Sequence, residues 1–286
     1  GVRLVGSEMC IRDSYRTIMR QKLLFMQAPT GVGKTISTIF PAVKAVGEEL
    51  ADRIFYLTAK TITATVAKET FALLEKNGYR AKTIQITAKE KLCPCDEMEC
   101  NPVTCPYAKG HFDRVNDAVF DLLHRCEMIE RDDILSQADR YTVCPFELCL
   151  DTASWCDNII CDYNYVFDPN VYLKRFFQEG IKGDYIFLID EAHNMVERSR
   201  QMYSAQIYKE DFLTVKRIMK EHSRSIEKAL EKCNKILLGM KRECENYTVY
   251  DTFGNMVFSF MRLMTLLDEL LQKANAVSYT HLRAHE

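Results

Sequence analysis

The stretch that most constrains the fold is an apolar run that leads into a glycine loop and a helix, KLLFMQAPTGVGKT at residues 22–35. This order predicts a buried strand, a tight turn and a helix that starts where the turn ends. Glycines let backbone N–H groups curl around an anion, and the N-terminus of the helix adds a positive dipole. The stretch therefore predicts a phosphate-binding loop between a strand and a helix.

The Gly-Lys-Thr end of this loop has the residue types that bind a nucleotide. We expect Lys34 to reach the β- and γ-phosphates of ATP and Thr35 to offer its hydroxyl to Mg²⁺. The expected nucleotide-binding residues are Thr30, Gly31, Val32, Gly33, Lys34 and Thr35. Ala28 stands where the common form of the motif has glycine. The position of the motif between a strand and a helix therefore supports a phosphate-binding loop better than its residues alone do. The alternative is a tight glycine turn without a ligand.

Strand and helix patterns alternate after the loop. RIFYLTA at residues 53–59 and TIQIT at 83–87 are typical of buried strands, and the segment between them is typical of a helix. This alternation predicts a parallel, doubly wound α/β sheet. We also expect Pro41 to kink or interrupt the helix that follows the loop. Residues 200–276 are helical in pattern, with two long helices expected from Phe212 to Met240 and from Val257 to Ala274.

An acidic pair closes the strand pattern YIFLIDEAH at residues 185–193. In open α/β sheets ligands bind at the carboxyl ends of the strands, so the pair is expected beside the phosphate loop. Asp190 would hold Mg²⁺, and Glu191 would orient and deprotonate the water that attacks the γ-phosphate. His193 would couple the γ-phosphate state to motion, or it would simply pack locally.

Four cysteines lie within KLCPCDEMECNPVTC, at positions 93, 95, 100 and 105, in a chain that has 12. The start of the sequence lacks the layout of a signal peptide, which favours a reducing compartment and therefore thiols or metal ligands over disulfides. Thiolates suit a zinc ion and an iron–sulfur cluster equally on residue type.

Charge and hydropathy exclude two classes of protein. The net charge of −2 argues against a protein held on nucleic acid by bulk charge alone. No apolar run approaches the roughly 18 residues that span a bilayer. We expect a cytoplasmic protein with no membrane partner.

The two ends carry unusual sequence. One DNA sequence, that of a transposon-type sequencing adapter, encodes Leu4–Ser14 on one strand and Val277–Glu286 on its complement. We expect both segments to be adapter-derived, without helix or strand periodicity, and to be excluded from reasoning about the fold.

The motifs APTGVGKT, YLTAKTITATVAKE, CPFELCLD, DYNYVFDP and LIDEAHN occur in this order, with a cysteine-rich insertion after the second. The sequence between about Tyr15 and Ala276 resembles the superfamily 2 DNA helicases of the XPD/DinG type. The resemblance implies a RecA-like P-loop sheet, interrupted by a small iron–sulfur domain and followed by a helical, Arch-like hairpin. The expected segments are 1–14 (tail), 15–88 (motor domain, first part), 89–150 (iron–sulfur domain), 151–199 (motor domain, second part with the DEAH box), 200–276 (incomplete Arch-like domain) and 277–286 (tail).

The same resemblance implies the ligands and partners. A 4Fe–4S cluster would be held by Cys93, Cys100, Cys105 and Cys144, with Cys95 as an alternative to Cys93 and zinc as an alternative to the cluster. Thr58, Lys60 and Thr61 match the family segment that touches the DNA backbone, with hydroxyls and an amine that suit phosphate. The expected partners of this monomeric motor are single-stranded DNA and junctions between single- and double-stranded DNA.

The resemblance implies an ATP-dependent DNA helicase that moves 5′ to 3′ in DNA repair or replication. We expect the second motor domain, with its arginine finger, to be absent from this fragment, which would then not unwind DNA by itself. The alternative is a zinc-containing P-loop protein that binds nucleotide as a switch or interaction module without helicase activity.

Overall fold

The computed structural model describes residues 2–27, 33–96, 98 and 100–283. The chain divides into two compact units, Gly1–Ser204 and Ala205–Glu286. The helices of the first unit are α1 (Val2–Met19), α2 (Lys34–Gly47), α3 (Thr61–Lys76), α4 (Lys89–Leu92), α5 (His111–Arg125), α6 (Arg131–Tyr141), α7 (Pro145–Ala153), α8 (Asn164–Phe167), α9 (Lys174–Phe177), the 3₁₀ turn η1 (Ala192–Asn194) and α10 (Met195–Met202).

A five-stranded sheet organises the first unit, in the order β3-β2-β4-β1-β5. The strands are β1 (Arg53–Leu57), β2 (Thr83–Gln85), β3 (Met128–Ile129), β4 (Asn158–Cys161) and β5 (Tyr185–Ile189). Each pair of neighbours is parallel, with Leu57 of β1 level with Cys161 of β4 and Ile189 of β5. The prediction of a parallel α/β sheet is confirmed, because helical connections return the chain to the same edge between strands.

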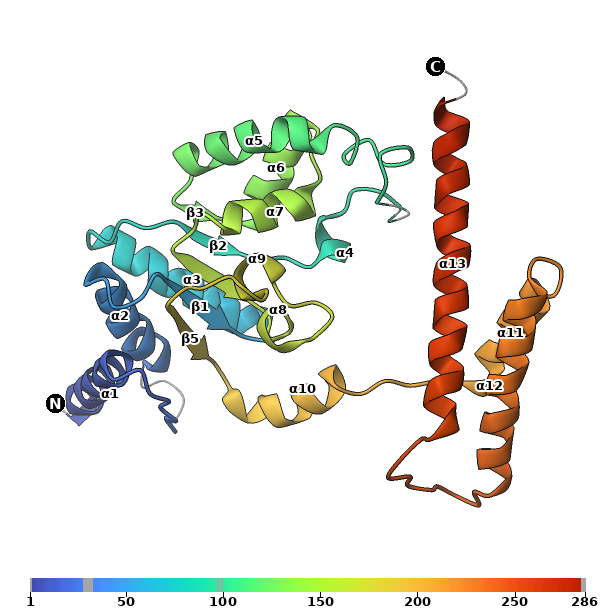
Figure 1. Cartoon of the computed structure of the whole chain (residues 1–286). Helices are drawn as coiled ribbons and strands as arrows, with labels where there is room; N and C mark the ends of the chain where they lie inside the picture. Colours follow the sequence, from blue (N-terminus) through green and yellow to red (C-terminus); the bar gives the residue numbers. More distant parts are fainter. Residues whose placement is uncertain (1, 28–32, 97, 99, 284–286) are drawn as a thin grey trace. The chain divides into compact units, whose positions relative to one another are not determined.

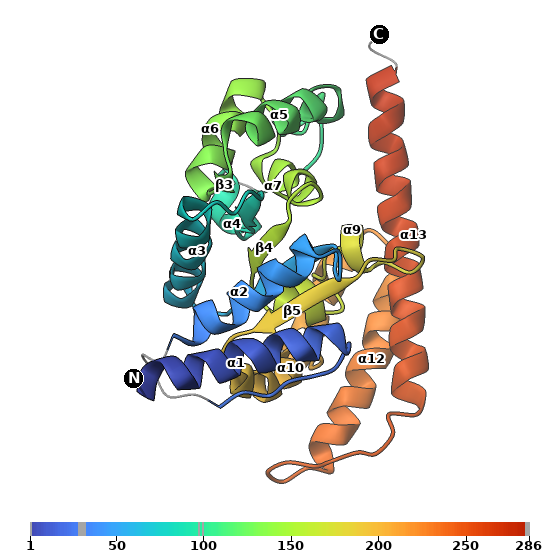
Figure 2. The same ribbon diagram turned by 90° about the vertical axis from the view of Figure 1, so that its left-hand side faces the viewer.

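The two faces of the sheet bury two different cores. Along β1, Phe55 and Leu57 join a core formed with α5, α6 and α7, whereas Ile54 and Tyr56 join a core formed with α2 and α3. This alternation follows the two-residue period of a strand, and burial on both faces explains why β1 reads as a continuous apolar run. Figure 1 shows α5, α6 and α7 together beside β2 and β3, and Figure 2 shows α1 lying along α2.

The strand expected before the phosphate loop is not formed by residues 22–27, and the helix after the loop is not interrupted at Pro41. Residues 22–27 form no strand, and the side chains of Leu23 and Phe25 are 89% and 86% exposed. An apolar run becomes a strand only where a sheet edge accepts its backbone hydrogen bonds, and this segment has no partner strand within the described residues. Pro41 does not interrupt α2, which continues to Gly47. Burial of Ile39 and Ala42 on either side of the proline holds the helix against the sheet.

The terminal segments are also more regular than the sequence predicted. Leu4–Ser14 lies inside α1, whose C-terminal turns pack Tyr15 and Ile18 against the core beside α2. Once those turns are fixed, extending a helix costs little, so an adjoining segment without periodicity can join it. The other terminal segment enters α13 (Asn255–Arg283) in the same way.

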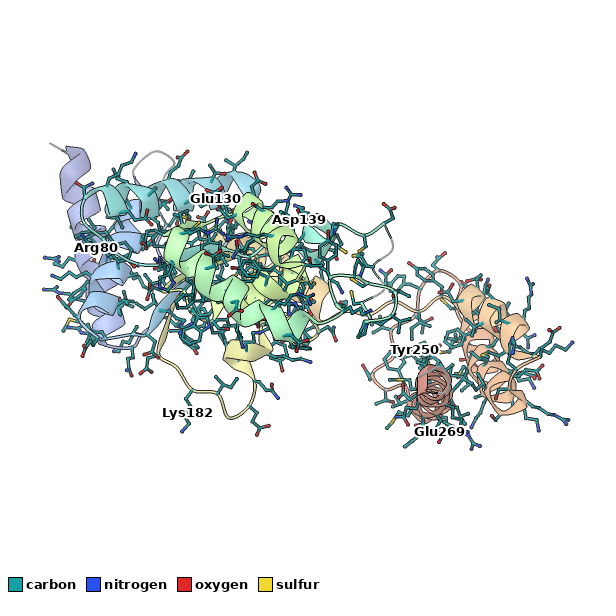
Figure 3. All side chains as sticks on the ribbon, turned by 90° about the horizontal axis from the view of Figure 1, so that it is seen from above. Arg80, Glu130, Asp139, Lys182, Tyr250 and Glu269 are labelled. Carbon is teal, nitrogen blue, oxygen red and sulfur yellow. The ribbon has the colours of Figure 1, made fainter. Side chains whose placement is uncertain are left out.

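The second unit contains three helices, α11 (Lys209–Met219), α12 (Arg224–Arg242) and α13. The single helix expected from Phe212 to Met240 is therefore wrong. It divides because Ser223 caps α12, its hydroxyl accepting a hydrogen bond from the Ile226 N–H at 3.4 Å. A small core of apolar side chains joins the three helices, and Phe212 stacks on Phe260 with ring centroids 5.5 Å apart. Figure 3 labels Tyr250, in the connection before α13, and Glu269 on α13 itself.

Candidate functional site

The carboxyl ends of β1, β4 and β5 present polar side chains at one edge of the sheet. Thr58 follows β1, Asp162 follows β4 and Asp190 follows β5. The strand ends are held level by hydrogen bonds from the Thr58 N–H to the Cys161 carbonyl and from the Asp190 N–H to the Leu57 carbonyl, both 3.0 Å long. This is the edge at which open α/β sheets bind ligands.

Lys34 brings the end of the glycine motif to this edge. Gly33 precedes α2 with a φ of 79°, a left-handed conformation that glycine adopts without strain, and its carbonyl accepts from the Ser37 N–H at 3.0 Å. The Lys34 Nζ then lies 3.4 Å from the Glu191 Oε1. Thr30, Gly31 and Val32, which the sequence assigned to nucleotide binding, lie outside the described residues.

Tyr56 connects the two candidate magnesium ligands. Its phenol interacts with the side chains of both Thr35 and Asp190. Burial and then the charge of Asp190 raise the pKa of Tyr56 above its ordinary value, while the hydrogen bond with Thr35 lowers it. Burial and then the charge of Glu191 raise the pKa of the Asp190 carboxyl, while Lys34 acts in the opposite direction. A half-buried carboxylate beside a second carboxylate favours a cation, because a cation relieves both the desolvation and the repulsion.

Glu191 occupies a sharp turn after β5. Its φ of 50° and ψ of 45° place a non-glycine residue in the left-handed region, at the start of η1. One carboxylate oxygen faces Lys34, and the other lies 3.4 Å from the Nδ1 of His193, whose side chain is 73% exposed. The Glu191 carboxylate therefore contacts both the Lys34 ammonium and the exposed His193 imidazole. Its backbone has a strained conformation of the kind that is often retained for function.

The segment after β4, which contains the motif DYNYVFDP, supports this acidic turn. The sequence alone did not explain the role of this motif. The Tyr163 hydroxyl donates a hydrogen bond to the main-chain carbonyl of Asp190. Asp162 accepts from the Arg198 guanidinium of α10 at 2.9 Å and 3.1 Å. The motif DYNYVFDP thus fixes both ends of the DEAH turn. Its position directly after a buried strand was the available signal, together with its tyrosine and aspartate.

The residues expected to touch DNA differ in their surroundings. Thr58 is buried, and its hydroxyl is hydrogen-bonded to Thr63, while the Lys60 N–H donates to it at 3.4 Å. Lys60 is exposed and directly precedes α3. The helix begins at Thr61, whose side chain lies outside the described residues. Thr58 therefore shapes the turn, whereas the side chain of Lys60 faces solvent.

The cysteine-rich insertion brings its thiols around Lys89. The ammonium group of Lys89 hydrogen-bonds to Cys100, and this bond raises the pKa of the lysine. The charges of Cys144 and Cys93 raise it further. Cys95 interacts with Cys105 and Cys93, and burial together with these neighbours raises its pKa to about 11.

Within residues 33–96, 98 and 100–273, no three His, Cys, Asp or Glu side chains stand at metal-binding spacing. Thiols are donors that suit a soft metal centre. Of the expected ligands, Cys93, Cys100 and Cys144 interact with Lys89, whereas Cys105 interacts with the alternative ligand Cys95.

A hydrogen-bonded frame holds Cys144 in this group. Cys144 precedes α7, with Pro145 in the first helical position, and its N–H donates to the buried His111 Nδ1 at 3.2 Å. Burial lowers the pKa of His111 and so favours the neutral form that accepts this bond. Arg114 of α5 donates to the carbonyls of Tyr141 and Thr142, at 2.8 Å and 2.6 Å. The late cysteine is therefore positioned by α5 and not by the loop of early cysteines.

None of the described helices combines the length and apolar character that a membrane-spanning helix needs.

The chain has recognisable relatives. A profile of the DEAD_2 family matches residues 67–212, just over half of the chain. The Fanconi anemia group J protein homolog of Gallus gallus is 28% identical over 76 residues, which is 27% of this chain and 6% of that protein. A solved structure titled XPD_Helicase matches 92% of this chain with a TM-score of 0.56 and 15% identity, and the match covers 50% of that chain.

A second solved structure, titled Truncated XPD, matches 90% of this chain and 76% of its own, with a TM-score of 0.53 and 15% identity. The present chain thus spans half of the first solved structure and a small part of the curated relative. The structural matches establish a shared fold, and the profile match covers the segment from α3 through the DEAH turn to α11. The chain therefore belongs to the DEAD_2 family.

Proposed function

We propose that this chain carries the nucleotide-binding part of an ATP-dependent DNA helicase, which couples ATP hydrolysis to movement on single-stranded DNA. The observation that carries the proposal is the meeting of Lys34, from the start of α2, with Glu191, from the end of β5, at 3.4 Å. Tyr56 places Thr35 and Asp190 in the same group. A lysine, a hydroxyl and two carboxylates at the edge of a parallel sheet are the residue types that phosphoryl transfer from ATP requires.

In this mechanism each residue has one task. Lys34 leaves Glu191 to bind the β- and γ-phosphates, and the release of this ion pair frees the carboxylate. Glu191 then accepts a proton from a water molecule. The oxygen of that water bonds to the γ-phosphorus, and the bond between the γ-phosphorus and the ADP oxygen breaks. Thr35 and Asp190 would hold Mg²⁺, which would supply positive charge against the phosphates. His193, beside Glu191, would pass the state of the γ-phosphate to neighbouring parts of the motor.

Nucleotide binding by the chain tests the proposal directly. A fluorescent ADP analogue, titrated with Mg²⁺, should bind the parent chain, and Lys34→Ala should raise its Kd at least about tenfold, because a charge-assisted contact is lost. Lys44→Ala is the matched control, since Lys44 lies on the same helix and pairs with Glu48 at 3.6 Å, away from the acidic turn. Equal affinity for the parent and Lys34→Ala would contradict the proposal.

We further propose a 4Fe–4S cluster on Cys93, Cys100, Cys105 and Cys144, with Cys95 as the alternative first ligand. The interactions of Cys93, Cys100 and Cys144 with Lys89, and those of Cys95 with Cys93 and Cys105, support a soft metal centre. Anaerobic purification with iron, sulfide and zinc analysis separates the two candidate functions. Iron and sulfide would support the helicase, whereas stoichiometric zinc in a colourless protein would favour a nucleotide switch without helicase activity.

The wider assignments are also part of this proposal. The protein would move 5′ to 3′ as a monomeric motor in DNA repair or replication, in the cytoplasm near the nucleoid. It would contact DNA through Lys60 and have the segment boundaries expected from the sequence. A second motor domain would be needed before duplex DNA is unwound. DNA-stimulated ATPase activity of the full-length protein tests the central claim. A nucleotide switch would show no stimulation by single-stranded DNA.

A further inference from the structure

A short segment directly after β4 contacts both the DEAH turn and α10. Tyr163 of this segment donates a hydrogen bond to the Asp190 carbonyl and is also hydrogen-bonded to the Asn194 side chain. Arg198 of α10 contacts the same segment through the carboxylate of Asp162. The contacts at positions 190, 194 and 198 recur every four residues, so the segment holds the chain before, within and after the 3₁₀ turn η1. In Figure 1, α10 follows β5 on the side of α8.

The hydrogen bonds of Arg198 come from one nitrogen. Its Nη2 lies 2.9 Å and 3.1 Å from the two carboxylate oxygens of Asp162 and 3.3 Å from the side-chain oxygen of Asn164. The Nε of the same guanidinium is buried and has no hydrogen-bond partner among the described residues. The guanidinium is thus paired end-on, and not through the two-nitrogen fork of the strongest arginine–carboxylate pairs. A contact of this kind needs a single donor nitrogen, which a lysine also has.

Asp162 gives α10 a fixed point on the sheet. It directly follows β4, which lies between β2 and β1, and its Oδ1 accepts a hydrogen bond from the Asn164 N–H at 2.9 Å. The side chains of Asp162 and Arg198 are both 31% exposed, so water weakens their attraction, and the pair by itself adds little to the stability of the chain. Its effect is therefore on the position of α10 more than on the free energy of folding.

Glu191 is the residue that depends on this position. Its φ of 50° is left-handed, and a residue with a side chain keeps such a conformation only where the surrounding contacts enforce it. Tyr163 enforces it before the turn, and Arg198 enforces it after the turn by fixing the helix that follows. If the second contact is lost, the turn can relax toward right-handed backbone, which rotates the Glu191 carboxylate away from the strand edge. Lys34 would stay in place, because it belongs to α2.

We propose that Arg198 is a positioning residue for ATP hydrolysis: its ion pair with Asp162 holds α10 at the end of β4 and so keeps the Glu191 carboxylate directed at the attacking water. This inference rests on the proposed function, because it assumes that Glu191 accepts a proton from that water. It adds that the rate of hydrolysis and the affinity for nucleotide depend on different contacts. Since Arg198 acts only through the turn, its loss lowers kcat and leaves nucleotide binding unchanged.

The test measures ATP hydrolysis by the full-length protein with single-stranded DNA, together with the Kd of the ADP analogue. We expect Arg198→Ala to lower kcat about 10–100-fold, the range expected for a misplaced catalytic group, with KM and Kd unchanged. Arg198→Lys should restore most of the parental kcat, because one nitrogen makes the contacts of Arg198. Arg200→Ala is the matched control, since Arg200 lies on the same helix, is 73% exposed and pairs with Glu197 at 3.8 Å.

Asp162→Asn tests the ion pair from the other side and carries the test if Arg198→Ala does not fold. Asn keeps an oxygen for the Asn164 N–H but lacks the charge that holds Arg198. We expect the same selective loss of kcat, and the double variant should be no slower than Arg198→Ala, because both changes remove one interaction. Without nucleotide, hydrogen exchange of residues 191–202 should be faster in both single variants than in the parent.

The outcomes separate this inference from the proposed function. A full-length parent that does not hydrolyse ATP contradicts both. A parent that hydrolyses ATP, together with Arg198→Ala at the parental rate, contradicts the role of Arg198 alone. The role of Arg198 is also overturned if Arg198→Lys is as slow as Arg198→Ala, if Arg200→Ala is equally slow, or if a weaker Kd accounts for the whole loss of activity.

Discussion

The hydroxyl of Tyr163 donates a hydrogen bond to the main-chain carbonyl of Asp190, across the carboxyl edge of the sheet. The two residues come from the ends of β4 and β5, which are separated in the sheet by β1. The bond fixes the peptide between Asp190 and Glu191, at the position where Glu191 enters the left-handed conformation. The orientation of both acidic side chains therefore depends on a residue outside the DEAH motif.

Tyr163→Phe removes the hydroxyl, which also hydrogen-bonds to the Asn194 side chain, while Phe keeps the buried ring. A partly buried carbonyl that loses its partner costs about 1–3 kcal/mol. We expect the free energy of unfolding to fall by this amount in urea denaturation, and the affinity for Mg²⁺ and the ADP analogue to weaken. Tyr247→Phe, at an exposed position, should change neither quantity. Unchanged stability in Tyr163→Phe would show that the bond does not hold the turn.

Glu191→Gln tests the role of the carboxylate as a base. Gln keeps the size of the side chain and an oxygen that can face Lys34, but it cannot accept the proton of water at neutral pH. In the full-length protein we expect ATP hydrolysis to fall about 10²–10⁴-fold while nucleotide affinity is retained. Glu197→Gln on α10 is the control, because Glu197 pairs with Arg200 on the surface, at 3.8 Å. Hydrolysis at the parental rate would assign the base elsewhere.

Asp190 gives the stability of the chain a specific pH dependence. Its pKa is raised above the usual 3.8, mainly by burial and then by Glu191, so the folded state binds the proton more tightly than the unfolded state does. The carboxyl stabilises the fold below its unfolded pKa, and this contribution is lost as the pH rises through the folded pKa. At neutral pH the ionised carboxylate therefore destabilises the chain.

We expect Asp190→Asn to raise the free energy of unfolding at pH 7, with a gain that shrinks as the pH falls toward the range where Asp190 is protonated. Mg²⁺ with nucleotide should stabilise the parent more than Asp190→Asn, because the cation needs the carboxylate. Urea denaturation at several pH values measures both effects. Asp117→Asn, at an exposed position on α5, should show no pH-dependent gain. The same gain at every pH would attribute the effect to packing instead of charge.

The cysteines yield a prediction about ligand identity. We expect Cys105→Ser and Cys144→Ser to lose the metal centre and Cys95→Ser to keep it, as assayed by iron and sulfide content and visible absorption after anaerobic purification. Cys233→Ser is a control, since Cys233 is buried in the second unit among apolar side chains. Loss of the centre in Cys95→Ser with retention in Cys93→Ser would make Cys95 the first ligand, which its contacts with Cys93 and Cys105 allow.

The sequence predicted the parts of this site that depend on local pattern. The glycine motif predicted Lys34 at the start of a helix, and the acidic pair was expected at the end of a strand, as observed. The parallel sheet followed from the alternation of apolar strands and helices. The ion pair between Lys34 and Glu191 joins residues far apart in the chain, and the sequence indicated it only through the rule that ligands gather at the carboxyl edge.

Other features of the structure could not be predicted from the sequence pattern, for physical reasons. Residues 22–27 are apolar enough for a strand, yet strand formation depends on a neighbouring edge, which composition does not specify. The break between α11 and α12 depends on a single serine cap within a continuous apolar periodicity. The bond from Tyr163 to Asp190 requires that β4 and β5 flank β1, which is a property of strand order.

The sequence by itself determined which chemical groups this protein has and where each stands along its chain: a lysine and a threonine after glycines, an acidic pair after a strand, and clustered thiols. Tertiary structure decided which of them meet. The Tyr56 phenol interacts with Thr35 and Asp190, and the Cys144 N–H donates a hydrogen bond to His111. The physical reason is that local pattern depends on the period of a helix or strand, whereas contacts between distant residues depend on the order and register in which strands pair.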